Sequence, residues 1–116
     1  MLFARLDQLE KRLANQRYLF GNAITDSDIR LYVTLVRFDA AYYSAFRTNR
    51  NRLVDFPNLS AYARDLYQTP GFGDTTDFDA IKKGYHLGQI ANNPYRLLPK
   101  GPDLSFWNTP HGRETL

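Results

Sequence analysis

The sequence contains no cysteine, and this absence restricts its chemistry more than any other feature. A chain without cysteine forms no disulfide, offers no thiolate to a metal ion and supplies no thiol nucleophile of its own. Histidine is almost as scarce. His86 and His111 are separated by a Pro/Gly-rich stretch and have no carboxylate at metal-ligand spacing, so we expect no metal site.

Long hydrophobic runs and a large excess of one charge are missing too. No stretch approaches the roughly 18 apolar residues of a membrane span, and the first residues lead into charges rather than a signal-peptide core. With 15 basic and 12 acidic residues the formal charge is +3, which is too small to indicate a nucleic-acid partner. We therefore expect a cytoplasmic protein with no membrane and no nucleic-acid partner.

Phosphate-binding and hydrolase motifs are also absent. There is no phosphate-cradling glycine loop and no G-x-S-x-G elbow, so nucleotide or hydrolase chemistry has no support. The arginine run at 47–52 (RTNRNR) is either a phosphate site or a solvated loop between helices. We favour the loop, because no aromatic residues are interleaved with the arginines.

What the sequence does contain is the material of one helical domain. Its 116 residues, 43% apolar and 23% charged, are ordinary for a globular protein with a real core. Residues 24–39 (ITDSDIRLYVTLVRFD) predict the core helix, with Thr25 and Asp28 as a capping box. This helix is apolar on most sides, which predicts burial by its neighbours. Asp39 lies among the apolar rows, so its carboxylate must be paired or hydrogen-bonded.

Three further helices are predicted from the spacing of apolar residues. Four leucines at steps of four, three and four predict an amphipathic helix over residues 2–20 that stops at Gly21. It begins without a cap, as though cut near its start. Pro57 begins a third helix that ends before Pro70. A shorter fourth helix follows a weaker cap, formed by Thr76 with Asp79.

The C-terminal end differs from the rest in composition. From residue 91 the chain is rich in Asn, Pro and Gly, which predicts a tail without regular structure. A segment of this kind is either disordered or wrapped on a surface for a purpose, and its Leu, Phe and Trp residues favour docking. We expect an all-α helical bundle in residues 1–90, incomplete at its start, with residues 91–116 as an irregular Pro/Gly-rich tail docked on the same domain.

Tyrosine is the residue type that leaves a question of function open. Packing plus one hydrogen bond from the hydroxyl explains those at helix-facing positions, which are Tyr32, Tyr43, Tyr62 and Tyr67. Tyr85 differs because it lies at the end of a short helix, where the chain turns into its tail, and a phenol there can reach a cleft. The position of Tyr85 alone still favours a role in packing over a functional role.

Several motifs together resemble one enzyme family. They are residues 16–21 (QRYLFG), 24–31 (ITDSDIRL), 35–39 (LVRFD), 65–68 (DLYQ), 70–71 (PG), 77–82 (DFDAIK), 93–94 (NP) and 110–113 (PHGR). The chain resembles the glutathionyl-hydroquinone reductases, the Xi class of glutathione transferases, nearly from end to end. The capping box is common to glutathione transferases generally, whereas LVRFD, DFDAIK and PHGR are specific to this class.

The resemblance implies the helical C-terminal domain of a two-domain enzyme. In that family a thioredoxin-like N-terminal domain, absent from this sequence, binds glutathione and carries a cysteine. The cysteine thiolate attacks the sulfur of a glutathionyl-hydroquinone and releases the hydroquinone, and a second glutathione resolves the mixed disulfide. Tyrosine hydroxyls steady the quinol oxygen. Glutathione is thus the implied cosubstrate, and the isolated chain is expected to be inactive.

The family's catalytic tyrosine matches Tyr85, the one site residue that the resemblance carries over. The chain departs from the family pattern on both sides of it, with Gly84 and His86 where the family often has histidine and an aromatic residue. Family dimers pair through this domain, so the resemblance also implies a homodimer. The alternative to an enzyme is a non-catalytic interaction or dimerisation module derived from a glutathione transferase.

Overall fold

The computed structural model describes residues 2–42, 51–88, 98 and 102–116. Its helices are α1 (Leu2–Arg12), α2 (Asp26–Arg37), α4 (Pro57–Tyr67) and α5 (Phe78–Leu87). Shorter elements join them: the π-helix η1 (Phe38–Tyr42) and the 3-10 turns η2 (Leu53–Asp55), η3 (Gly73–Thr75) and η4 (Leu104–Asn108). The described part contains no strand, which confirms the all-α fold, and none of its helices is long and apolar enough to cross a membrane.

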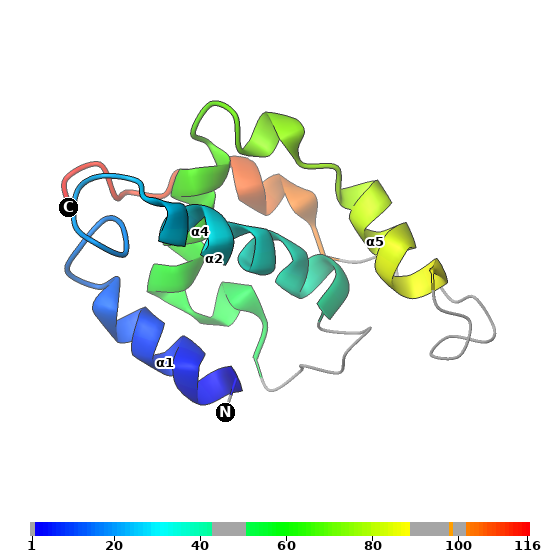
Figure 1. Ribbon diagram of the computed structural model, residues 1–116, viewed down its shortest axis with the longest axis horizontal. Helices are drawn as coiled ribbons and strands as arrows, with labels where there is room; N and C mark the ends of the chain where they lie inside the picture. The colour runs from blue at the N-terminus through cyan, green and yellow to red at the C-terminus, as the bar shows by residue number, and fades with distance from the viewer. Residues whose placement is uncertain (1, 43–50, 89–97, 99–101) are drawn as a thin grey trace.

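The most deeply buried helix is α4. It packs against α1, α2 and the short elements η2, η3 and η4, and Leu59, Tyr62 and Leu66 are fully buried in it. Figure 1 shows α2 and α4 crossing near the middle of the molecule, with α5 at the far end from α1. The expectation that α2 would be buried on most sides is wrong, because Ile29 and Val33 on it are 47% and 43% exposed.

The start of α2 is the capping box that the sequence predicts. The Thr25 amide donates to Asp28 Oδ2 at 2.9 Å. The Asp28 carboxylate is fully buried, and it also accepts the Leu19 amide at 3.0 Å and the Tyr62 hydroxyl at 2.6 Å. Asp28, whose carboxylate completes the capping box, therefore also joins α2 to the preceding loop and to α4.

The first helix ends at Arg12, so the prediction of a helix over residues 2–20 is wrong in its second half. Side-chain bonds hold the following loop instead: Gln16 Nε2 donates to the carbonyls of Tyr18 (2.9 Å) and Leu19 (2.6 Å). Gly21 does not stop a helix. It has φ of +112°, which suits glycine, and it closes a tight turn by pairing with Tyr18.

The N-terminus of α4 is capped by a side chain from another helix. Pro57 is the first residue of α4, as predicted, and the cap position Phe56 offers no hydrogen-bonding side chain. The Glu10 carboxylate of α1 accepts the amides of Asn58 (2.9 Å) and Leu59 (2.8 Å) instead. This contact satisfies two amides of the first turn and holds α1 on α4.

The cap of α5 is shifted by one residue from the prediction. Asp77, not Thr76, is the cap, and its carboxylate accepts the Ala80 amide at 3.1 Å. The Thr76 hydroxyl has other partners: it donates to the Phe72 carbonyl at 2.9 Å and lies 2.8 Å from the Tyr32 hydroxyl. Both residue types cap helices, so only these tertiary partners distinguish the two positions.

Residues 102–116 pack on the helices through two anchors, Trp107 and Arg113, which are 4% and 3% exposed. The 3-10 turn η4 corrects the prediction of a tail without regular structure. The guanidinium of Arg113 donates to the Arg17 carbonyl at 2.9 Å and also to that of Gln16. The predicted boundary between domain and tail, at residues 90 and 91, lies outside the described residues and stays a prediction.

Candidate functional site

Two tyrosine hydroxyls meet where η1 packs against α5. The oxygens of Tyr42 and Tyr85 lie 3.2 Å apart, at the outer limit of a hydrogen bond, and either can be the donor. Their rings contact edge to face, with centroids 5.2 Å apart and planes at 80°. Both side chains are half-buried. Tyr85, the sequence candidate, thus lies in a phenol pair rather than alone.

Each phenol is placed by the helix that carries it. Tyr85 lies two turns after Phe78 on α5, on the same face as Phe78 and Ile81, which pack on the core. Tyr42 ends the π-helix η1, which continues α2 past Arg37. The wider π-turn changes the direction in which successive side chains point, and such turns often occur at functional sites.

The environment keeps the Tyr42 phenol protonated. Burial, followed by the hydrogen bond and charge of Tyr85, raises the pKa of Tyr42 to about 12. The guanidinium of Arg37 opposes these effects and lowers that pKa. At neutral pH Tyr42 is consequently a neutral hydrogen-bond donor and not a nucleophile or a base.

A pair of this kind suits stabilisation of an oxygen that gains negative charge. A phenol that accepts a hydrogen bond from its neighbour is polarised, which strengthens the bond that it donates to a third atom. Such preorganised donors are most effective where water is partly excluded. The pair provides no nucleophile, and the sequence provides no cysteine.

The structure places Tyr32 and Tyr62 apart from this site. Tyr32 and Tyr62 are buried and each makes a hydroxyl hydrogen bond, to Thr76 and Asp28, which confirms the prediction of packing plus one bond. Tyr43 lies outside the described residues. Sequence reasoning missed Tyr42, because its partner is 43 residues away and its helical row looks like ordinary core.

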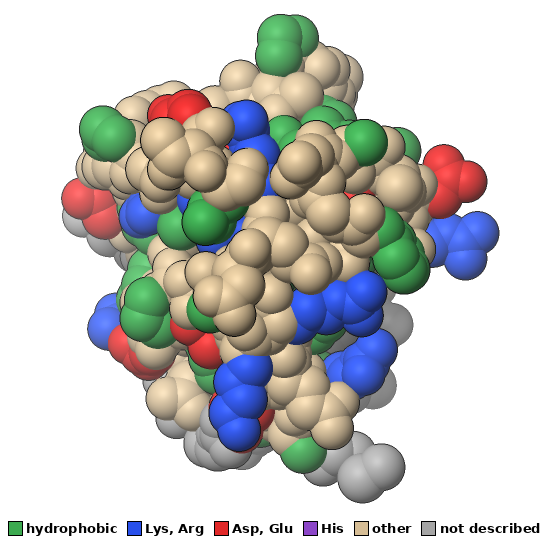
Figure 2. Space-filling model, turned by 90° about the vertical axis from the view of Figure 1, so that its left-hand side faces the viewer, with side chains coloured by type: hydrophobic (Ala, Val, Ile, Leu, Met, Phe, Trp, Pro, Cys, Tyr) green, Lys and Arg blue, Asp and Glu red, His purple; other side chains and the backbone are tan. Residues whose placement is uncertain are grey.

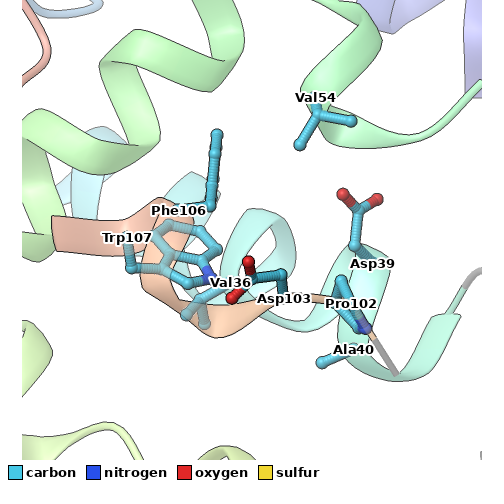
Figure 3. Close-up of a pocket in the computed structure, with 8 residues that line it drawn as sticks. All are labelled: Val36, Asp39, Ala40, Val54, Pro102, Asp103, Phe106 and Trp107. Carbon is cyan, nitrogen blue, oxygen red and sulfur yellow. The ribbon is translucent and has the colours of Figure 1, made fainter. Parts of the chain in front are cut away.

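A small pocket lies beside η1. It has about 270 Å³ of empty space, much of it open to solvent, and Figure 3 shows its lining: Val36, Asp39, Ala40, Val54, Pro102, Asp103, Phe106 and Trp107. The Asp39 carboxylate points toward η2 and accepts the Leu53 amide at 2.6 Å, which confirms that this carboxylate is hydrogen-bonded. Burial raises the pKa of Asp39. Asp39 thus holds η2 in place at this end of α2.

The histidines take structural roles. His86 is buried, and its Nδ1 lies 2.9 Å from the Lys82 carbonyl one turn earlier in α5. His111 Nδ1 accepts the Arg113 amide at 3.0 Å. Within the described ranges no group of three or more His, Cys, Asp or Glu side chains is arranged to hold a metal ion. Of the arginine run, Arg52 is exposed, and residues 47–50 lie outside the described part.

Comparisons of the chain with protein families and with known proteins all indicate the same family. The family described as "Glutathione S-transferase, C-terminal domain" matches residues 1–65. Glutathionyl-hydroquinone reductase YqjG of Escherichia coli (strain K12) is 42% identical over 113 residues, which are 97% of this chain and 34% of that protein. The chain spans about a third of the length of the curated relatives that it matches.

Solved structures agree over nearly the whole chain. A glutathione transferase from Gordonia bronchialis has a TM-score of 0.95 at 57% identity, covering 98% of this chain and 36% of that one. An Xi class glutathione transferase from Natrialba magadii has a TM-score of 0.95 at 43% identity, covering 99% and 35%. The glutathione-bound structure of YqjG has a TM-score of 0.92 at 41% identity, covering 97% and 36%.

Proposed function

The chain belongs to the glutathione S-transferase C-terminal domain family, and we propose that it forms the substrate-side domain of a glutathionyl-hydroquinone reductase. The observation that carries the proposal is the contact of 3.2 Å between the Tyr42 and Tyr85 hydroxyls. A neutral donor pair of this kind suits the quinol oxygen of a departing hydroquinone. The identity to YqjG over 97% of the chain supports the reaction class.

In the proposed reaction a thiolate attacks the glutathionyl sulfur. A sulfur–sulfur bond forms, the bond between sulfur and the ring carbon breaks, and that carbon ends with a proton in place of sulfur. Before the attack, the quinol hydroxyl next to the sulfur-bearing carbon loses its proton and becomes a carbonyl while that carbon gains a proton, so the electron pair of the broken bond passes onto this oxygen as the ring departs. Tyr85, supported by Tyr42, donates a hydrogen bond to this oxygen and lowers the energy of the departing anion.

The nucleophile and most of the glutathione contacts belong, in this proposal, to a thioredoxin-like N-terminal domain. The sequence has no cysteine, so the thiolate must come from elsewhere. A relative that binds glutathione superimposes on 97% of the chain, which supports glutathione as the cosubstrate. A homodimer and a cytoplasmic location complete the proposal.

Substitution of Tyr85 in the full-length protein that contains this chain tests the proposal. Tyr85→Phe keeps the ring packing and removes the donor, so we expect kcat for reduction of a glutathionyl-hydroquinone to fall by roughly one to two orders of magnitude. Tyr18→Phe, a buried tyrosine on the loop after α1, serves as the matched control and should leave kcat unchanged.

Two outcomes would count against the proposal. Full activity of Tyr85→Phe would remove this phenol from the mechanism. A full-length wild-type protein without reductase activity would favour the alternative, a non-catalytic interaction or dimerisation module.

A further inference from the structure

We propose that Trp107 of the C-terminal tail is a positioning residue for the Tyr42–Tyr85 pair. Its importance for catalysis rests on the proposed function, whereas its effect on the geometry of the pair does not. The inference begins from the place of Trp107 in the fold, where it packs on Phe78 of α5 and lines a pocket together with residues of η1.

Trp107 fills the junction between α4, α5 and the tail. It is 4% exposed, and its ring centroid lies 5.3 Å from that of Tyr67, the last residue of α4, and 5.6 Å from that of Phe78, the first residue of α5. Phe106 contacts it edge to face at 5.2 Å. A side chain with this many aromatic neighbours fixes their spacing, because packed rings leave little free volume.

The contact with Phe78 acts on the helix that carries Tyr85. Phe78 and Tyr85 are seven positions apart on one face of α5, which is about 10 Å along the helix axis. A helix of this length moves as a rigid rod over such a distance. A shift of Phe78 into space vacated by Trp107 would therefore displace the Tyr85 hydroxyl.

Trp107 also lines a pocket that borders η1, the element that carries Tyr42. Trp107 and Phe106 line the pocket together with Val36 at the end of α2 and with Asp39 and Ala40 of η1 (Figure 3). Ala40 is 3% exposed and lies two residues before Tyr42. Trp107 thus packs on the beginning of α5 and borders the pocket beside η1, and the two phenols meet where these two elements pack together.

Hydrogen bonds hold the tail on the end of α4 and thereby fix the position of Trp107. Gln68, just after α4, donates from its Nε2 to the carbonyls of Trp107 (3.0 Å) and Thr109 (2.7 Å), on both sides of the end of η4. The Thr109 hydroxyl donates to the Phe106 carbonyl at 2.6 Å. These bonds fix the backbone that carries the indole. A docked tail has a purpose in this arrangement, which is to set the distance between two helical elements.

The pair is sensitive to such a shift. The two oxygens are 3.2 Å apart, so a displacement of a few tenths of an ångström breaks the bond. A buried residue with only a stabilising role would change the free energy of unfolding when it is truncated, and would leave the geometry of the folded pair unchanged. Measuring the geometry of the folded pair therefore distinguishes a positioning role of Trp107 from a role in packing alone.

The test measures geometry and activity in the full-length protein that contains this chain. Nuclear Overhauser effects between the Tyr42 and Tyr85 rings, whose centroids lie 5.2 Å apart, report the pair, with assignments from Tyr→Phe variants. Trp107→Ala should weaken them markedly and Trp107→Phe should weaken them less. Leu6→Ala, a core truncation on α1, is the control for lost stability and should leave them unchanged.

In the full-length protein Trp107→Ala should lower kcat by about 10-fold, and Trp107→Phe by about 2- to 3-fold, with KM little changed, because the donor is misplaced and not removed. Unchanged ring contacts and kcat in folded Trp107→Ala would overturn the proposal. If that variant does not fold, Trp107→Phe decides, and wild-type values for it would overturn the proposal as well. Weakened ring contacts together with full activity of Tyr85→Phe would instead reject the proposed function and leave the positioning role standing.

Discussion

The two ends of the molecule are built from different interactions. One end, which we call the clip end, holds the loop from Leu13 to Thr25, the start of α2, Asp65 of α4 and the last residues of the chain. The other, the tyrosine end, holds η1 and α5. Helix α2 leads from the first end toward the second (Figure 1).

At the clip end, the buried carboxylates of Asp28 and Asp65 accept hydrogen bonds on both oxygens. Asp65 is 2% exposed and accepts the Arg17 guanidinium in a bidentate pair at 2.8 and 2.9 Å. This hydrogen bonding raises the pKa of Arg17. His111 Nε2 approaches the same carboxylate at 3.5 Å. On the outer surface of this end, Figure 2 shows basic and acidic side chains interspersed and hydrophobic ones scattered, which is typical of a solvated face.

At the tyrosine end, half-buried phenols replace the buried charges. Tyr42 and Tyr85 are coupled by one long contact, and aromatic packing through Trp107 holds their helices. The comparison teaches that the buried ion pair and the proposed site lie toward opposite ends of α2. A site that admits a substrate cannot be closed by a network of buried ion pairs, which agrees with the position of the proposed site at the tyrosine end.

The largest effect on stability should come from the ion pair of the clip end. Asp65→Ala leaves the Arg17 guanidinium next to Arg113 and His111 without its carboxylate, and we expect a loss of about 3 to 5 kcal/mol in the free energy of unfolding. Urea denaturation measures it. The ring contacts of Tyr42 with Tyr85 should persist in the folded fraction.

Asp79→Ala is the matched control for this change. Asp79 pairs with Lys83 at 3.0 Å, but both side chains are more than half exposed, so its loss should cost about 0.5 kcal/mol or less. Equal losses for the two variants would show that the clip end is not the stabilising end.

A smaller effect should distinguish two tyrosine hydroxyls that lie at opposite ends. Tyr62→Phe removes a donor from the fully buried Asp28 carboxylate and should cost about 1 to 3 kcal/mol. Tyr42→Phe removes a half-buried contact between two hydroxyls and should cost less than about 1 kcal/mol. Urea denaturation compares the two losses in the free energy of unfolding. A greater loss for Tyr42→Phe would mean that the tyrosine end, and not the clip end, contributes more to stability.

The last effect should be absent at neutral pH and appear only in alkaline solution. Burial raises the pKa of Tyr62, and of Tyr42 to about 12, so folded phenols keep protons that unfolded tyrosines lose near pH 10. The free energy of unfolding should therefore fall as pH rises above about 10, by up to about 1.4 kcal/mol per pH unit for each such tyrosine. The contribution of Tyr42 should level off near pH 12, where the folded phenol also ionises, while that of Tyr62 continues.

Urea titrations at several pH values between 9 and 12 check this prediction. Each Tyr→Phe variant should show a shallower alkaline decline than the wild type. Parallel declines for wild type and Tyr62→Phe would mean that burial does not raise the pKa of this phenol.

Much of the fold could be predicted from residue patterns. The capping box of Thr25 and Asp28, the start of α4 at Pro57 and the need of Asp39 for a partner all follow from local chemistry, and the structure confirms each of them. The helix over residues 2–20 was the main error. Apolar spacing alone cannot tell where a loop with side-chain partners takes over from a helix, as it does after Arg12.

The candidate site was predictable only in part. The resemblance identified Tyr85, but nothing in the sequence links it to Tyr42, whose row on the helix reads as core. The same holds for Trp107 and for the Glu10 cap of α4, since each acts on a residue far away in sequence. Patterns of period 3.6 report the face on which a residue lies and not its partner.

The sequence by itself determined that this chain is an all-α domain without a nucleophilic sulfur, and it determined which segments form the four helices, because caps, prolines and apolar spacing act over a few residues. Only the tertiary structure decided which groups distant in sequence meet: Asp65 with Arg17, Tyr42 with Tyr85, and Trp107 with Phe78 at the start of α5. Such contacts depend on how helices cross and on where the tail docks, which local chemistry does not encode.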